Sequence, residues 1–95
     1  MAQKHVVKIR LRPGNRKKCD VPDFKMKKGD DLQFDFPEAP DSVVTFTGTS
    51  PFGDNPGVRI ELGKARIATV TGHFEETVVW GSGGGGDGAG SGDVG

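Results

Sequence analysis

The amino-acid sequence predicts an all-β protein of six to eight short strands, packed as a sandwich or a barrel. Short segments alternate between apolar and polar residues, which is the pattern of a strand with one buried face. Clusters of Gly, Pro, Asn and Asp separate these segments, as turns separate the strands of such folds. No segment carries apolar residues at the helical period over more than about one turn.

The first third of the chain predicts two strands joined by a basic turn. Residues 7–11 alternate Val, Ile and Leu with Lys and Arg, so we expect a strand there. Pro13-Gly14-Asn15 ends it, because Pro has no amide hydrogen and both Gly and Asn accept positive φ. Three basic residues, 16–18, then form a turn before a short second strand at 19–21. Pro22 limits that strand to a sheet edge or a bend.

Residues 24–36 organise the predicted core. They contain two alternating apolar runs on either side of a Lys-Lys-Gly-Asp-Asp turn, which is typical of a β-hairpin or a tight strand corner. Successive side chains of a strand point to opposite faces, so the bulky apolar residues of each run share one face. The residues that we expect to be buried on this face are Phe24, Met26, Leu32, Phe34 and Phe36.

A loop, a strand and a second loop follow. The prolines of residues 37–41 exclude a helix or a central strand there. Residues 42–47 are rich in β-branched and aromatic side chains, so we predict a strand. Its inward pair is Val44 and Phe46. Residues 48–57 carry the densest turn chemistry of the chain and form a long loop with Phe52 in its middle.

The pattern predicts three further strands before residue 81. Residues 58–62 alternate regularly, and a Gly-Lys turn separates them from a strand at 65–71. In that strand either Ile67 or Val70 faces inward. Residues 74–80 form the last predicted strand.

The composition changes sharply after Trp80. Residues 81–95 contain only Gly, Ser, Asp, Ala and one Val, which together bury almost no apolar area. Glycine also loses more conformational freedom on ordering than any other residue. We therefore predict one domain over residues 1–80 and a disordered Gly-rich tail over residues 81–95.

Charge and cysteine content narrow the class of protein. The net charge is zero over 95 residues, but residues 1–28 carry +8 and the remainder −8. The single cysteine, Cys19, excludes an internal disulfide framework and fits a reducing compartment. No apolar run is long enough for a signal peptide or a transmembrane helix. We expect a cytoplasmic monomer without membrane contact, if the chain is a full gene product.

One stretch resembles the cupredoxin-like family. Residues 21–34, Val-Pro-Asp-Phe-Lys-Met-Lys-Lys-Gly-Asp-Asp-Leu-Gln-Phe, match a family pattern in which a proline, spaced aliphatic residues and Lys-x-Gly-Asp precede a core strand that ends in Phe. A strand after a proline loop, and then Ser50-Pro51-Phe52, extend the likeness over residues 7–80. The resemblance implies a Greek-key β-sandwich of the cupredoxin type.

The same resemblance raises the question of copper. The family's usual function is electron transfer through one copper ion, held by a His before the middle strand and by a Cys, a His and a Met around the last strand. Where the first His would stand, after Pro40, this chain has Asp41 and Ser42, and no Cys, His or Met follows His73. We therefore predict no type 1 copper site, no electron transfer and no cofactor. A divergent copper- or metal-binding relative of the family is the leading alternative.

Any other metal site would need the remaining soft or imidazole side chains. These are Cys19, Met26, His5 and His73, and none of them forms a close pair in the sequence. Thiols and thioethers are usually packed in cores, so we expect Cys19 and Met26 to be buried. We expect His5 and His73 at the surface, at a strand start and at a turn.

No set of residues forms a catalytic motif, so we predict that the protein is not an enzyme. Asp30-Asp31 are better explained as turn and strand-entry residues than as paired carboxylates. Glu75-Glu76 are explained in the same way, as a solvated strand end. The candidate nucleophiles that lack any activating motif are Ser42, Ser50 and Cys19.

The basic first third of the chain raises a further alternative, a nucleic-acid surface. The cations at the first turn are Arg10, Arg12, Arg16, Lys17 and Lys18. Base-stacking aromatic residues are absent from the same strand, so we predict that nucleic acid is not the ligand. We expect a solvated surface in which these cations pair across the sheet with Glu61, Glu75 or Glu76.

These observations together predict a non-catalytic binding or structural module. The expected contact is with a protein partner, either at a sheet edge or through the loop around Phe52. The sequence identifies neither the partner nor the residues that bind it.

Overall fold

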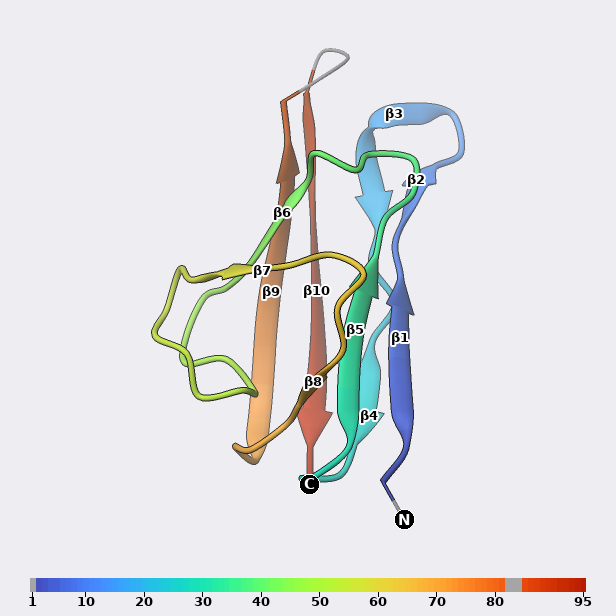
Figure 1. Cartoon of the computed structure of the whole chain (residues 1–95). Coiled ribbons are helices and arrows are strands. Elements are labelled where there is room, and N and C mark those ends of the chain that lie inside the picture. Colours follow the sequence, from blue (N-terminus) through green and yellow to red (C-terminus); the bar gives the residue numbers. More distant parts are fainter. Residues whose placement is uncertain (1, 82–84) are drawn as a thin grey trace.

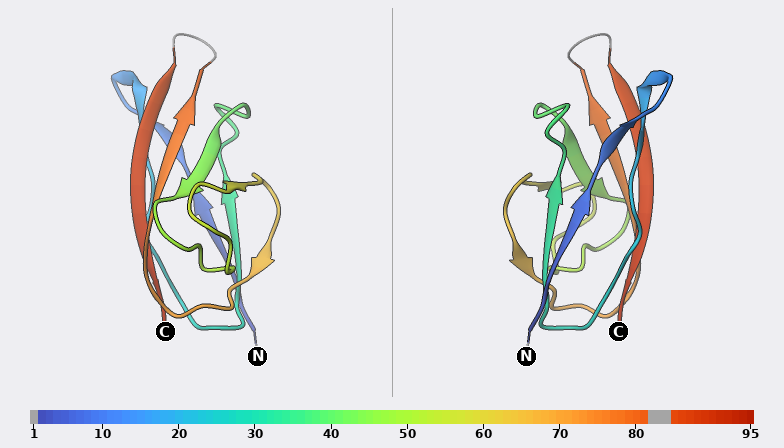
Figure 2. Two further views of the ribbon diagram at one scale, coloured as in Figure 1. Left: turned by 90° about the vertical axis from the view of Figure 1, so that its left-hand side faces the viewer. Right: turned by 90° about the vertical axis from the view of Figure 1, so that its right-hand side faces the viewer.

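The computed structural model describes residues 2–81 and 85–95. The chain is all-β, as the sequence predicts, and its strands form two sheets that pack as a β-sandwich (Figures 1 and 2). The described residues include no helix of the length and apolar character that a membrane crossing requires.

The two sheets differ in size. The smaller sheet contains, in spatial order, β1 (Lys4–Lys8), β5 (Asp31–Asp35) and β8 (Arg66–Ile67). The larger sheet contains β2 (Arg10–Arg12), β3 (Asn15–Asp20), β10 (Gly86–Val94), β9 (Gly72–Trp80), β6 (Val43–Phe46) and β7 (Arg59–Ile60). The short strand β4 (Phe24–Met26) also pairs with β10. β1 runs parallel to β5, whereas β9 is antiparallel to both of its neighbours.

The strand predicted at residues 7–11 is divided between the two sheets. β1 pairs with β5 in the smaller sheet, and β2 pairs with β3 in the larger one. Ile9 lies at the crossing, where its side chain is buried and its amide donates to the Asp35 carbonyl at 2.8 Å. Because the alternation continues through the crossing, the sequence pattern resembles one strand. The basic residues 16–18, predicted as a turn, belong to β3, and the turn itself lies at Gly14, whose φ is 78°.

The central segment is a strand corner, the second of its two predicted forms. β4 lies beside β10 in the larger sheet, and β5 lies between β1 and β8 in the smaller one. Between them Gly29 has a φ of 99°, a conformation that residues with side chains rarely adopt. All of the predicted inward residues of this segment are buried: Phe24, Met26, Leu32, Phe34 and Phe36.

The prediction of a disordered tail is wrong for residues 86–94. They form β10, which pairs antiparallel with β9 along its whole length. On its other side β10 runs parallel to β3 and β4, so it lies inside the larger sheet (Figure 1). The sandwich therefore extends well past residue 80. Residues 82–84 of the predicted tail lie outside the described residues.

Alternating glycines explain why this segment is ordered. The inner face of β10 carries Gly86, Gly88, Gly90 and Gly92, and a Cβ atom at any of them would overlap a neighbouring side chain. At Gly88, for example, the Cys19 side chain occupies the space that a Cβ would need. Close packing against the bare backbone, together with hydrogen bonds on both sides of the strand, offsets the entropy that glycine loses.

One buried cluster fills the space between the sheets. Phe34 and Phe46 meet edge to face, with 6.0 Å between their ring centroids. Phe36 contacts Trp80 in the same geometry at 5.3 Å. Val44 and Phe46 are both buried, as the sequence predicts for residues 42–47.

The strands predicted at residues 58–62 and 65–71 are much shorter in the structure. β7 and β8 have two residues each. Ile67 does not face inward, since 58% of it is exposed, whereas Val70 packs against the core. The amide of Val70 donates to the Pro51 carbonyl at 3.0 Å, so a loop contact replaces strand pairing at this point.

Candidate functional site

The soft and imidazole side chains do not assemble into a site. Cys19 and Met26 lie in the core, as predicted, with exposed fractions of 3% and 6%. The His73 side chain is 58% exposed, which confirms its predicted surface position, whereas that of His5 is half-buried. Across residues 2–81 and 85–95, no three His, Cys, Asp or Glu side chains are grouped so as to hold a metal ion.

Asp30 joins the start of the chain to the strand corner. Its carboxylate bonds with two backbone amides and one imidazole, those of Gln3 (3.0 Å), Lys27 (3.2 Å) and His5 (3.0 Å). The amide of Gln3 has the largest effect, and together these bonds hold the pKa of Asp30 below its usual value. Asp30 therefore acts as a turn residue, as predicted, and Asp31 is the first residue of β5.

A group of polar contacts, the Ser50 clasp, holds the loop of residues 48–57. The clasp consists of Ser50, Asp54, Arg66 and the ring of Phe52. The Ser50 hydroxyl accepts from the Asp54 amide at 3.0 Å, and the Asp54 carboxylate binds the Arg66 guanidinium through two bonds of 2.6 and 3.2 Å. Arg66 in turn lies over the Phe52 ring, 4.5 Å from its centroid. Phe52 is therefore engaged within the fold.

Glu75 and Glu76 do not form a solvated strand end. Glu75 is exposed, but Glu76 is fully buried, and neither of its carboxylate oxygens has a hydrogen-bond partner within the described residues. Burial raises the pKa of Glu76 to about 7. A sequence signal did exist, because Phe74, Glu76, Val78 and Trp80 continue a single alternating face. The prediction of an exposed Glu76 follows instead the usual preference of a charged side chain for solvent.

The cations of the first third pair with aspartates and not with the predicted glutamates. Arg12 lies 3.0 Å from Asp20, and Lys18 lies 2.6 Å from Asp87, with both pairs exposed. Glu61 instead pairs within its own turn. The predicted partners are wrong because Asp87 belongs to β10, a segment whose composition alone predicts a disordered tail.

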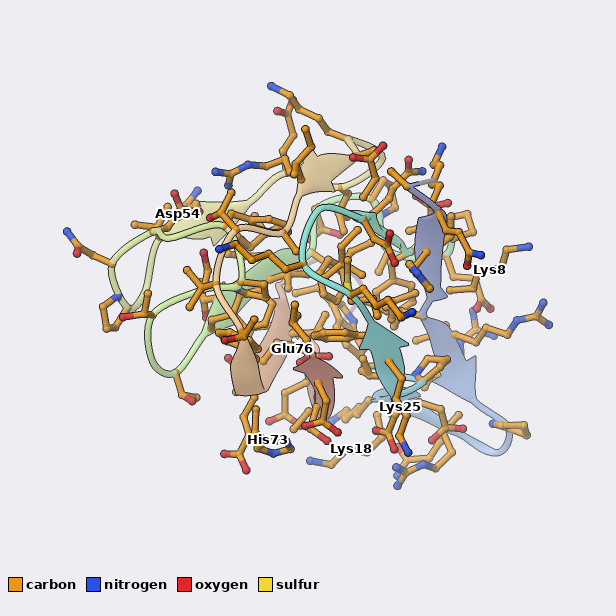
Figure 3. The ribbon with its side chains drawn as sticks, turned by 90° about the horizontal axis from the view of Figure 1, so that it is seen from below. Lys8, Lys18, Lys25, Asp54, His73 and Glu76 are labelled. Atoms are coloured by element: carbon orange, nitrogen blue, oxygen red, sulfur yellow. The ribbon has the colours of Figure 1, made fainter. Side chains whose placement is uncertain are left out.

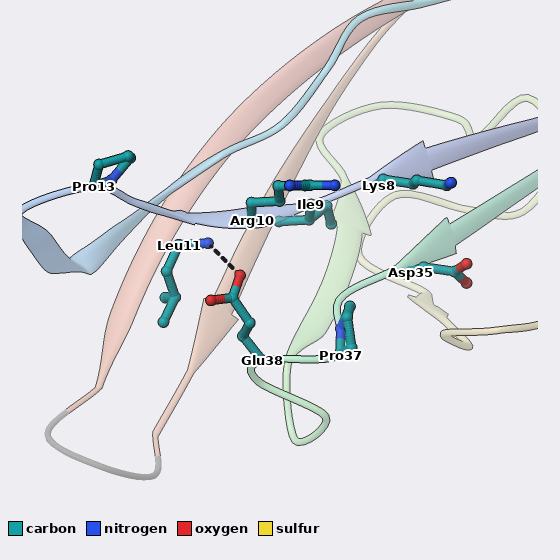
Figure 4. Close-up of a pocket in the computed structure, with 8 residues that line it drawn as sticks. All are labelled: Lys8, Ile9, Arg10, Leu11, Pro13, Asp35, Pro37 and Glu38. Atoms are coloured by element: carbon teal, nitrogen blue, oxygen red, sulfur yellow. Dashed lines mark hydrogen bonds between the residues drawn. The ribbon is translucent and has the colours of Figure 1, made fainter.

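An open groove of about 610 Å³ lies where the chain crosses from β1 to β2 (Figure 4). The Ile9 amide still bonds to the Asp35 carbonyl, but Pro37 follows and has no amide hydrogen with which to extend the pairing. The Leu11 amide donates to a side chain and not to a neighbouring strand: Glu38 Oε1 accepts this hydrogen bond at 3.0 Å. The groove is lined by Lys8, Ile9, Arg10, Leu11, Pro13, Asp35, Pro37 and Glu38.

The groove combines an open strand edge with two cations, Lys8 and Arg10, and two acids, Asp35 and Glu38. The acids are already engaged, because the Asp35 carboxylate accepts from Gln33 and that of Glu38 from the Leu11 amide. Among the described strands β2 pairs with β3 alone, and its other edge faces the groove. Lys8 and Arg10 are exposed at the rim, and in the described part of the chain neither takes part in an ion pair. Such an edge offers both backbone groups and positive charge to an extended ligand.

No protein-family model, no curated protein and no solved structure matches this chain. The resemblance to the cupredoxin-like family therefore remains a prediction.

Proposed function

We propose that the chain is a non-catalytic binding module that takes an extended, acidic segment of a protein partner along the open edge of β2. One observation carries the proposal: the Leu11 amide, which a neighbouring strand would otherwise bind, is bonded by the carboxylate of Glu38. In an added peptide strand, a main-chain carbonyl would accept from the same amide. Glu38 is exposed, so it can swing away and leave the amide to a ligand.

Two kinds of interaction support such a complex. A peptide that adds to a sheet edge gains affinity from main-chain hydrogen bonds. Lys8 and Arg10 then favour a segment that carries carboxylates, because complementary charge raises specificity and the rate of association. The proposal keeps the expected cupredoxin-like Greek-key sandwich as a scaffold and requires no metal.

Nucleic acid is the weaker ligand for the same cations. Proteins that bind single strands combine a basic groove with aromatic side chains on which bases stack. None of the described residues that line this groove is aromatic. A phosphate backbone also cannot satisfy an amide edge at the regular spacing of a peptide strand.

A titration of the nitrogen-15-labelled chain tests the proposal. The probe is a capped peptide of alternating Glu and Val, about ten residues long, which matches the length of a strand. We expect the largest shift at the Leu11 amide, with smaller shifts along Arg10–Arg12. The comparison ligands are the same peptide with Lys in place of Glu, and a short single-stranded DNA. A stronger response to DNA, or a Leu11 amide that does not move, would contradict the proposal.

Variants test whether the Glu38 carboxylate competes with the peptide for the Leu11 amide or itself helps to bind the peptide. Glu38→Gln should tighten peptide binding about threefold to tenfold, because a neutral amide competes less well for the Leu11 amide. Replacing both Lys8 and Arg10 with Ala should weaken binding by about tenfold or more. Lys64→Ala, outside the groove lining, serves as the matched loss of a cation and should leave binding unchanged. Weaker binding by Glu38→Gln would overturn the assignment of Glu38 as a competitor.

A further inference from the structure

Glu76 is a buried acidic residue that takes no part in the proposed binding edge of β2. It lies midway along β9 with its side chain toward the interior, whereas His73 points away from the sandwich (Figure 3). Its exposed fraction is 0%, and neither carboxylate oxygen finds a hydrogen-bond donor within the described residues. An ionised carboxylate in such a place is disfavoured, so the folded protein favours the neutral form of Glu76.

The strand that covers this carboxyl is β10. Glu76 lies opposite Gly90 in the antiparallel pairing of β9 and β10. A Cβ atom at Gly90 would lie 2.7 Å from Glu76 Oε1 and 2.8 Å from Val21 Cβ, so the carboxyl and Val21 both pack on the bare backbone of Gly90. Glu76 is therefore enclosed by a strand that has no side chain at the point of contact.

The backbone amide of Glu76 itself favours the ionised form and lowers the pKa, but the rest of the surroundings offers little compensation for a negative charge. Two of the nearby ionisable groups are acidic, Glu75 on β9 and Asp23 in the β3–β4 connection, and both oppose ionisation of Glu76. His73 favours ionisation, but Asp93 of β10 already engages its ring at 2.7 Å. The core residues of the facing sheet are apolar. The residues paired opposite Glu76 on β10 and β6 are uncharged: Gly90 and Phe46.

We propose that Glu76 is a proton-operated latch on the middle of β10, which closes this segment onto the sandwich when the side chain is protonated and lets it open locally when the proton is lost. Burial raises the pKa of Glu76 from 4.5 to about 7 in the closed state, whereas an opened strand would expose the carboxyl to water and restore its ordinary pKa. The closed state therefore binds the proton more tightly than the open one. Closure is strongest below pH 4.5 and weakens as the pH rises through about 7.

Cys19 is a natural reporter of this opening. Its thiol is buried against Gly88 of the same strand, and it is the only cysteine of the chain. We would measure how fast an aromatic disulfide reagent labels this thiol in the wild type and in Glu76→Gln, a neutral variant of nearly equal shape. Because the thiolate fraction rises with pH in both proteins, the readout is the ratio of the two rates.

The latch predicts a rise in this ratio. Between about pH 5.5 and about pH 8.5, the labelling rate of the wild type relative to Glu76→Gln should increase about tenfold or more. A ratio that stays constant over this range would overturn the proposal. The carboxyl carbon signal of Glu76 in the wild type gives a second readout that needs no variant, and a titration midpoint near 4.5 would overturn the proposal as well.

Amide hydrogen exchange separates a latch from a general loss of stability. Over the same pH range, protection factors of β10 amides should fall about tenfold, while those of β5 amides such as Phe34 should hold within about twofold. Equal losses in β5 and β10 would show global unfolding and would refute a local latch. The peptide titration at Leu11 is independent of this result, so either proposal can fail alone.

Discussion

The Ser50 clasp shows how single side chains can replace a sheet in holding a loop. The Arg66 guanidinium binds both oxygens of Asp54 and also covers Phe52, so one cation joins the loop of residues 48–57 to β8. The sequence marks this loop by its Gly and Pro content, but the partner of Asp54 lies twelve residues away. Turn propensity is local, whereas the choice of an ion-pair partner depends on the packed fold.

Asp54→Asn should destabilise the protein by about 1 to 2 kcal/mol, because Arg66 loses a charged partner in a pair that is only partly exposed. The bonds from Arg66 hold the pKa of Asp54 below its usual value. The stabilising effect is therefore present above the unfolded-state pKa of Asp54 and is lost as the pH falls through the folded-state pKa.

Urea denaturation at neutral pH and at about pH 2.5 measures this effect, with the difference between wild type and variant expected to shrink in acid. Glu61→Gln provides the control, because Glu61 forms an exposed ion pair with Lys64. This variant should alter stability by less than about 0.5 kcal/mol. A wild-type advantage that persists unchanged in acid would contradict the role given to Asp54.

At the level of the element, β10 shows that composition and pattern can give opposite predictions. The composition of residues 81–95 is typical of a disordered linker. The order of the residues is different, since glycine recurs at every second position from Gly86 to Gly92. That period matches one face of a strand, and the face is the one that Trp80, Cys19 and Phe24 pack against.

Gly92→Ala should therefore destabilise the sandwich by about 2 kcal/mol or more, because the new Cβ would overlap the ring of Phe24. Ala89→Ser on the exposed face of the same strand is the matched control, and its effect should be within about 0.5 kcal/mol. Thermal unfolding followed by circular dichroism measures both. Similar melting temperatures for Gly92→Ala and the wild type would show that β10 does not pack as described.

At the level of the whole molecule, the last segment of the chain completes the sandwich. β10 separates β9 from β3 and β4, so the larger sheet would be divided in two without it. Even the final residue takes part, because the Gly95 amide bonds to the Met26 carbonyl and the Gly95 carbonyl accepts from Lys28. The opposite charges of the two halves also meet here, in the pair between Lys18 and Asp87.

A chain that ends at Trp80 should consequently fail to fold cooperatively, because the buried edges of β9 and β3 would lose their backbone partner. Amide proton-nitrogen spectra measure this directly, and we expect collapsed signal dispersion for the truncated chain. Adding a synthetic peptide of residues 85–95 should restore dispersed signals. A native-like spectrum from the truncated chain alone would contradict this role of β10 and would favour the prediction of a disordered tail.

The sequence determined the all-β class and most of the core, because side-chain alternation is a local property that one strand reveals by itself. Phe34 and Val44 could be placed inside on that basis, and both are buried. The tertiary structure decided which edges pair and which face of a strand is covered. The burial of Glu76, the contact of Glu38 with the Leu11 amide and the open edge of β2 all follow from those pairings. A sheet edge could be proposed as a contact surface from the sequence alone, but proposing the edge of β2 in particular required the nonlocal hydrogen bonds that only the folded chain forms.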